Sequence, residues 1–292
     1  MQSLLRLHQA TPAPVVYFLA GCLPLPALLH LRMFSLFGQL CRLRDGDNIL
    51  AKHAMNILSS ANSSSKSWFW ILRGLCLQYG LPPPSTWLSC QPTKLQIKSL
   101  AKAAVIQYWL HYLRAQADSL SCLKYMQTGF MGLTKCHPLF RSRGPSPWEV
   151  EKATSQARLL SGRYRVESLT GHWVPGNREG LCTLPDCWGT SAAHKGTVEC
   201  LLLSCPSLST TREALTEYSL TFLQTYPLLL PLALECLALD SVQFWLDCST
   251  MPAVISAVQA GDDENVLFVL LNLTRNYCHS LHKARLSLLQ CE

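Results

Sequence analysis

The stretch KLQIKSLAKAAVIQYWLHYL, residues 94–113, decides the fold class. Its apolar residues recur at the spacing of one face of an α-helix: Ala103, Ile106, Leu110 and Leu113. Its basic residues fall every four positions and predict a basic stripe on the same helix: Lys94, Lys98 and Lys102. The alternation typical of strands is scarce elsewhere. We therefore expect a mainly α protein built from helical bundle regions.

Helical patterns outside this stretch outline the organisation of the chain. They predict helices at residues 28–43, 154–165, 211–225, 232–246 and 265–289. The stretch Gly144–Pro147 interrupts the pattern and predicts a boundary. We expect a helical basic region at 1–143 and a Cys-rich region at 148–292, with C-terminal helices in its second half. The apolar runs at 15–23 and 228–239 are short or broken by Pro231 and Glu235, so we expect no membrane span.

Charge is distributed unevenly along the 292 residues. The net charge is +7, yet residues 206–292 hold four basic and nine acidic residues, a balance of −5. Residues 1–205 therefore carry 21 basic and 9 acidic residues, a balance of +12. A basic front half suits a surface that binds a polyanion, although a solvated surface explains the charge equally well. The hydrophobic share of 49% excludes wholesale disorder.

Cysteines indicate both the compartment and a metal site. The chain has 14 of them in a long, Leu-rich sequence, which argues against a short secreted disulfide scaffold and favours reduced thiols in the cytoplasm or nucleus. A cluster at about 178–206 predicts a small structural zinc unit, similar to a zinc knuckle. Two ligand sets remain open: Cys182, Cys187 and Cys200 with either Cys205 or His194. Burial of apolar thiols without a metal is the competing explanation.

A basic and aromatic segment precedes the cysteines. Guanidinium groups suit phosphate contacts and aromatic rings suit base stacking. The candidate nucleic-acid-binding residues here are Arg158, Arg163, Tyr164, Arg165, His172 and Trp173, which join the lysine stripe. An amphipathic helix with solvated arginines explains the same composition.

Catalytic motifs are scarce. The pair Asp262–Asp263 resembles the paired aspartates of some polymerases, but a helix-like run precedes it, and an acidic first helical turn is the simpler interpretation. The sequence has no Walker-type glycine loop, Gly-x-Ser-x-Gly elbow or His-Glu-x-x-His motif. We therefore expect no enzymatic activity.

A series of blocks occurs in a definite order along the chain. They are LPALLHLR (25–32), SLFG (35–38), SSKSWFW (64–70), LQYGLP (77–82), ARLLSGRYR (157–165), Cys182-x4-Cys187 and LLLSCP (201–206). With the tail at 244–289, they resemble the region downstream of the polymerase palm in LINE-type (non-LTR) retrotransposon reverse transcriptase polyproteins. The resemblance covers nearly the whole chain.

The resemblance implies nucleic-acid binding without chemistry. In that family, which comprises RNA-directed DNA polymerases, such a region helps to hold template RNA and target DNA during target-primed reverse transcription. The palm motif Tyr-x-Asp-Asp is absent, because its aromatic position is Ala260, and no endonuclease segment precedes the blocks. We therefore expect a truncated, non-catalytic fragment. Its partners would be RNA or DNA, and the missing palm region.

The same resemblance bears on the zinc ligands. The family usually has histidine at the third ligand position, where this chain has Cys200, and the Cys-Pro block favours Cys205 over His194 as the fourth ligand. The alternative function is a helical protein-interaction or scaffold protein that binds no nucleic acid.

Overall fold

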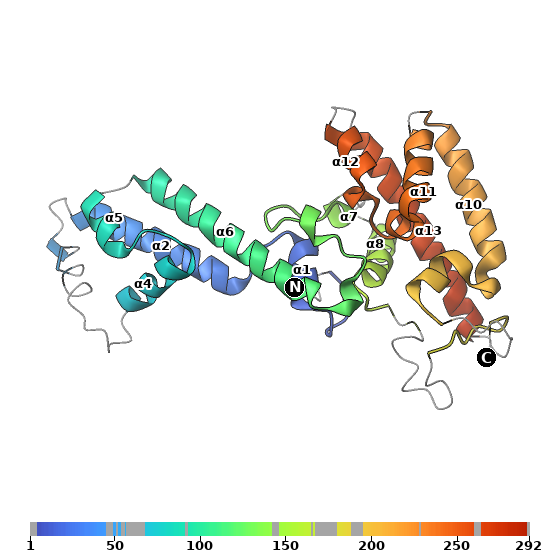
Figure 1. The fold of residues 1–292 in the computed structure, drawn as a ribbon, viewed down its shortest axis with the longest axis horizontal. Helices are drawn as coiled ribbons and strands as arrows, with labels where there is room; N and C mark the ends of the chain where they lie inside the picture. Colours follow the sequence, from blue (N-terminus) through green and yellow to red (C-terminus); the bar gives the residue numbers. More distant parts are fainter. Residues whose placement is uncertain are drawn as a thin grey trace. The chain divides into compact units, whose positions relative to one another are not determined.

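The computed structural model describes residues 5–44, 49–50, 52–53, 56, 68–90, 93–141, 146–164, 166, 180–187, 195–227, 229–259 and 264–290. Over these residues the chain is 77% helical and forms no strand, which confirms the expected helical class (Figure 1).

Each helix that the sequence predicts has a counterpart in the structure, with ends that differ by up to seven residues, and further helices lie between them. The α-helices are α1 (Ala13–Ala20), α2 (Leu25–Arg44), α4 (Trp68–Gln78), α5 (Pro84–Cys90), α6 (Lys94–Asp118), α7 (Pro138–Arg141), α8 (Pro147–Leu160), α10 (Ser209–Gln224), α11 (Leu229–Asp247), α12 (Pro252–Gln259) and α13 (Glu264–Gln290). Short turns of other helix types are η1 (Ser121–Leu123), η2 (Thr128–Phe130), η4 (Cys200–Ser204), η5 (Pro206–Leu208) and η6 (Cys248–Thr250).

Contacts between residues divide the chain into two compact units. The larger unit takes Met1–Ala20, Ala117–Met131 and Lys135–Glu292, and the smaller unit takes Gly21–Gln116 and Gly132–Thr134. The stretch at 144–147, expected to be a boundary, therefore lies inside the larger unit.

The sequence of that stretch fits a helix start as well as a linker. The Ser146 hydroxyl accepts a 3.3 Å hydrogen bond from the backbone N–H of Glu149, which caps α8. Pro147 occupies the first helical position, where its missing N–H costs nothing.

The smaller unit has an aromatic core. Phe34 and Phe37 of α2 lie 6.1 and 5.9 Å from Trp87 of α5, measured between ring centroids. The face of α6 that joins this core consists of Ile97, Ala101 and Val105. The apolar stripe expected on α6 was therefore placed wrongly at one end, because Ala103 is exposed. Many positions of this helix are apolar, so its sequence fits apolar stripes that begin one or two residues apart equally well.

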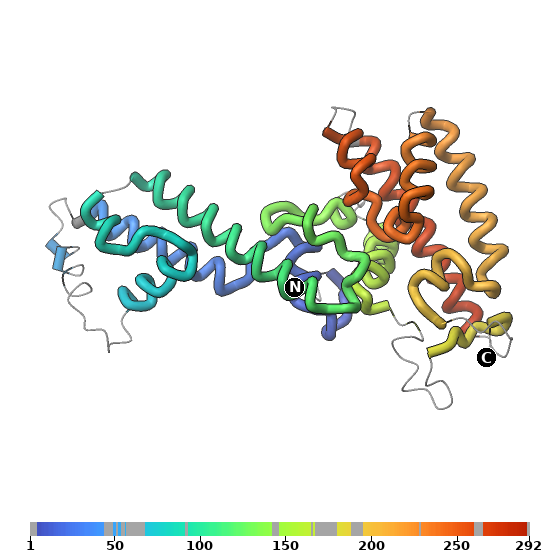
Figure 2. Tube along the Cα trace, in the orientation of Figure 1, coloured from blue at the N-terminus to red at the C-terminus, as the bar shows by residue number. Residues whose placement is uncertain are grey.

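In the larger unit, α13 is the central helix. It packs against α8, α10, α11 and α12, and the tube in Figure 2 shows it running beside α11 and α10. Gln156 of α8 links two of these helices, since its side-chain amide donates to the carbonyl oxygens of Trp245 and Leu246 at 2.8 and 3.0 Å. These carbonyls lie in the last turn of α11, where helical partners are lacking.

Helix α8 ends before residue 165, where the sequence pattern placed its end. Gly162 adopts φ +61°, a left-handed conformation that terminates a helix and that glycine adopts without strain. A Cβ at this position would lie 2.0 Å from the carbonyl oxygen of Cys122. Only glycine fits this helix end.

One helical stretch of the described residues, Leu229–Gln259, is long and apolar enough to cross a membrane. Of its most apolar window, 44% is buried inside the structure, and core helices of soluble proteins pass the same test. Helices α1 and α2 pass only when they are taken together as one broken span.

Candidate metal centre

Two chain segments carry the four clustered cysteines. The first covers residues 180–187 and the second begins at residue 195. They run antiparallel where they meet, because Gly196 N–H donates to the Gly180 carbonyl at 2.9 Å and Leu181 pairs with Lys195 in an isolated bridge. This pairing holds Cys182 close to the second segment.

A tight turn positions Cys187. Its backbone N–H donates to the Leu184 carbonyl at 2.9 Å, and Pro185 occupies a central position of the turn. The turn is tied to the second segment by Ser207, whose hydroxyl accepts a 3.0 Å hydrogen bond from Asp186 N–H.

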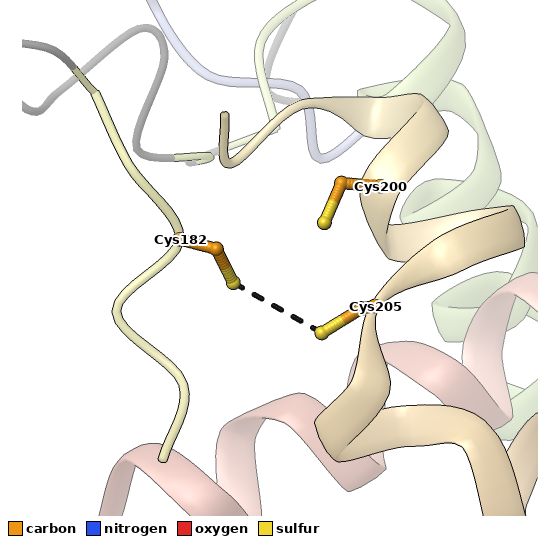
Figure 3. A group of neighbouring side chains, drawn as sticks. All are labelled: Cys182, Cys200 and Cys205. Atoms are coloured by element: carbon orange, nitrogen blue, oxygen red, sulfur yellow. Dashed lines mark hydrogen bonds between the residues drawn. The ribbon is translucent and has the colours of Figure 1, made fainter. Parts of the chain in front are cut away.

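Cys200 and Cys205 lie at either end of one wide helical turn. The backbone N–H of Cys200 donates to the Thr197 hydroxyl at 3.1 Å, which caps the start of the turn. The π-helical turn η4 closes when Cys205 N–H donates to the Cys200 carbonyl at 2.7 Å. A five-residue separation in a π-turn brings both side chains to the same side, facing Cys182 (Figure 3).

Three of the four sulfur atoms converge closely enough to hold a metal ion. Those of Cys182, Cys200 and Cys205 all lie within 4.8 Å of one another, and all three residues are buried. Cys182 Sγ lies 4.0 Å from Cys205 Sγ, and Cys187 Sγ lies 3.4 Å from Cys205 Sγ. Thiolates bound to one tetrahedral ion at about 2.3 Å lie about 3.8 Å from each other, whereas a disulfide needs about 2.05 Å. The geometry therefore fits shared coordination better than a disulfide.

The crowding of these thiols opposes ionisation of the metal-free cluster. A hydrogen bond with Cys182 raises the pKa of Cys200 to about 11, outweighing the lowering by Cys205, and burial adds to the rise. For Cys205, the hydrogen bond with Cys182 lowers the pKa. The hydrogen bond with Cys200 and burial outweigh this effect, and the pKa rises to about 12. A bound cation would reverse this balance, because metals deprotonate the thiols that coordinate them.

Residues from distant helices support the cysteine segments. The Arg212 guanidinium of α10 donates to the Cys205 carbonyl at 2.6 Å, and the Tyr277 hydroxyl of α13 donates to the Leu202 carbonyl at 2.9 Å. Sequence reasoning missed both residues, since nothing near them in sequence marks a partner that lies 7 or 75 positions away.

Glu199, next to Cys200, is fixed by an ion pair with Lys124. Burial would raise the pKa of the Glu199 carboxyl, but hydrogen bonding with Lys124 and Tyr125 lowers it to about 2. This carboxylate is therefore ionised across the physiological range and engaged with a lysine.

The predicted nucleic-acid-binding residues differ in their exposure and in their contacts. Tyr164 is 5% exposed and its hydroxyl lies 2.8 Å from His282 Nδ1, so its ring is packed and offers no face to a base. Arg158 donates to the Arg6 carbonyl at 3.0 Å, whereas Arg163 is exposed. The lysine stripe is exposed on α6 of the smaller unit: Lys94, Lys98 and Lys102. The other predicted residues, Arg165, His172, Trp173 and the alternative ligand His194, lie outside the described residues.

Comparison of the chain with protein-family models, with curated proteins and with solved structures found no match.

Proposed function

We propose that the chain is a non-catalytic nucleic-acid-binding module organised around a structural zinc ion, and that it derives from the C-terminal region of a LINE-type reverse transcriptase. The observation that carries the proposal is the convergence of buried thiols from two segments on one point. The proposed origin rests on the order of the sequence blocks that resemble that family. RNA and DNA are the proposed partners, in the cytoplasm or nucleus.

Zinc is the metal that this donor set fits best. Soft thiolate ligands select zinc, copper(I) or iron–sulfur clusters, and tetrahedral sites made only of cysteine are typical of structural zinc. We assign Cys182, Cys187, Cys200 and Cys205 as its ligands. Because all four residues are buried, the ion would have no open position for substrate, which makes its role structural.

The nucleic-acid-binding surface is proposed from exposed cations. Lys94, Lys98 and Lys102 project from α6 at one-turn spacing, which suits a row of backbone phosphates. Arg163 follows α8 and is exposed.

The test is binding of single-stranded RNA to the full chain across a series of salt concentrations. The triple variant K94A/K98A/K102A removes three charges from one stripe. The matched control K52A/K135A/K195A removes three exposed lysines that are dispersed over the chain. We expect the stripe variant to lower the slope of log affinity against log salt by about 2, and the control to change it less. Affinity that does not depend on salt, or equal effects of both variants, would reject the proposed surface.

A scaffold function is the second candidate, and the apolar surface of the smaller unit favours it. Large aliphatic side chains are more than 45% exposed there: Leu25, Leu28, Leu29, Leu36, Ile71, Leu77, Leu95 and Leu100. Such surfaces pack against protein partners or against a domain that is missing. The variant R163A/R165A separates the candidates, because loss of RNA binding with unchanged folding would reject a pure scaffold.

A further inference from the structure

A pocket lies in the larger unit, on the three-helix face formed by α8, α13 and α10. Its volume is about 340 Å³. Trp148 of α8 and Tyr218 of α10 both line it, and both are large aromatic residues with 50% and 57% of their surface exposed. Since α8 and α10 each pack against α13, that helix supplies further lining residues: Asn276, Tyr277, His279 and Ser280.

Exposed aromatic rings at a pocket need an explanation, because burying such a ring is strongly favourable. A flat aromatic ligand that stacks on Trp148 or Tyr218 would remove this apolar surface from water. The pocket volume accommodates one nucleobase and excludes a helix. Stacking on aromatic side chains is the usual way in which proteins hold unpaired bases.

His279, which lines the pocket, has a side-chain nitrogen that needs a hydrogen-bond partner. Its side chain is 2% exposed, and its Nε2 has no hydrogen-bond partner among the described residues. Its Nδ1 lies 3.2 Å from the Ser155 hydroxyl, which donates its own hydrogen to the Glu151 carbonyl at 3.0 Å. With the hydroxyl hydrogen used in this way, Ser155 accepts from Nδ1–H, and Nε2 is then a bare acceptor. Burial also lowers the pKa of His279 and so favours this neutral form.

The charges at the rim balance each other. Lys152 and Lys283 lie 5.5 and 5.9 Å from the centroid of the Trp148 ring. Lys152 pairs with Glu149 at 2.7 Å and Lys283 pairs with Glu151 at 2.9 Å. A rim with two cations and two carboxylates gives a phosphate group little net attraction. The aromatic ring of the ligand must therefore make the contacts that determine binding.

From these contacts we infer that the pocket binds one unpaired nucleobase that bears an exocyclic amine, stacked on Trp148 and flanked by Tyr218. The amine of adenine or cytosine supplies the donor that His279 Nε2 lacks. This inference rests on the proposed function, because it names the part of the nucleic acid that the module reads.

The test uses the full chain labelled with 5-fluorotryptophan, and the Trp148 resonance is assigned by its absence in W148F. Adenosine monophosphate is titrated in parallel with purine riboside monophosphate, in which a hydrogen atom replaces the amine and the six-membered ring has no N–H donor, and with inorganic phosphate. We expect adenosine monophosphate to shift the Trp148 resonance at concentrations up to about 10 mM, and purine riboside monophosphate to bind about fivefold more weakly. Phosphate should leave the resonance unchanged.

Controls separate the pocket from general binding. Y218A should weaken nucleotide binding about fivefold or more, whereas Y226A, which truncates another exposed tyrosine just beyond α10, should not. A silent Trp148 resonance, equal binding of both nucleotides, or a response to phosphate alone would overturn the inference. If nucleotides bind at Trp148 but single-stranded RNA does not bind the chain, the proposed function fails and the pocket stands. If RNA binds the chain while the Trp148 resonance stays unchanged, the pocket inference fails and the proposed function stands.

Discussion

The Tyr277 hydroxyl donates a hydrogen bond of 2.9 Å to the carbonyl oxygen of Leu202, inside the turn that joins Cys200 to Cys205. The ring of Tyr277 is itself stacked on Trp245, with centroids 3.7 Å apart and planes at 10°. Through this hydrogen bond, the central helix α13 holds the helical turn between Cys200 and Cys205 in place. Removing this hydrogen bond should destabilise the turn without altering a cysteine.

The first prediction concerns this contact. Tyr277→Phe keeps the stacked ring but leaves the Leu202 carbonyl without its donor, so we expect a loss of about 1–2 kcal/mol in the free energy of unfolding. Urea denaturation followed by circular dichroism measures it. Tyr218→Phe, which removes an exposed hydroxyl, serves as the control and should change nothing. Equal stabilities of Tyr277→Phe and the unaltered chain would show that the contact is not formed.

The second prediction tests whether Cys187 joins Cys182, Cys200 and Cys205 as a ligand of the proposed zinc ion. Cys187→Ser should lower zinc affinity by an order of magnitude or more, because it removes one of four thiolates, whereas His194→Ala should leave the affinity unchanged. Competition with a chromogenic chelator measures both. Cys236→Ala controls for loss of a buried thiol outside the cluster. The opposite ranking of the two variants would exchange Cys187 for His194 in the ligand set.

The third prediction tests the end of α8. Gly162→Ala should destabilise the larger unit by about 1 kcal/mol or more, because alanine disfavours φ +61° and its Cβ would collide with the Cys122 carbonyl. Gly74→Ala, in the middle of α4 with no atom within 4 Å of the new Cβ, should instead stabilise its helix by up to about 1 kcal/mol. Thermal unfolding distinguishes the two. A tolerated Gly162→Ala would contradict the described helix end.

The fourth prediction follows from His282. Burial is the main cause that lowers the pKa of His282 to about 4, and His279 and the positive charge of Arg158 contribute to this shift. The unfolded chain, with a histidine pKa near 6.5, binds more protons between these values, so stability should fall as the pH drops from about 6.5 towards 4. His282→Gln should flatten this part of the pH profile, measured by urea denaturation, whereas the exposed His111→Gln should not. A profile that His282→Gln leaves unchanged would refute the buried neutral state.

The helices could be predicted from sequence because the information is local. Residues 265–289 and 211–225 carry apolar positions at helical spacing, and α13 and α10 begin and end within two residues of these limits. The start of α8 was missed because Ser146 and Pro147 suit both a linker and a helix cap.

The site was predictable only in part, since its supports are distant in sequence. Cysteine spacing predicted a cluster of Cys182, Cys187 and Cys200 with either Cys205 or His194, and the structure brings Cys182, Cys200 and Cys205 within 4.8 Å of one another. The spacing could not reveal Tyr277 as a support of the turn. Tyr164 shows the converse limit, because an aromatic residue between two arginines suits base stacking equally well whether its ring is buried or exposed.

Native mass spectrometry of the full chain, purified under reducing conditions, tests the central claim most directly. We predict a mass that corresponds to one zinc ion per chain, lost together with helical content when a strong chelator is added. A metal-free chain with its helical spectrum intact would contradict the account.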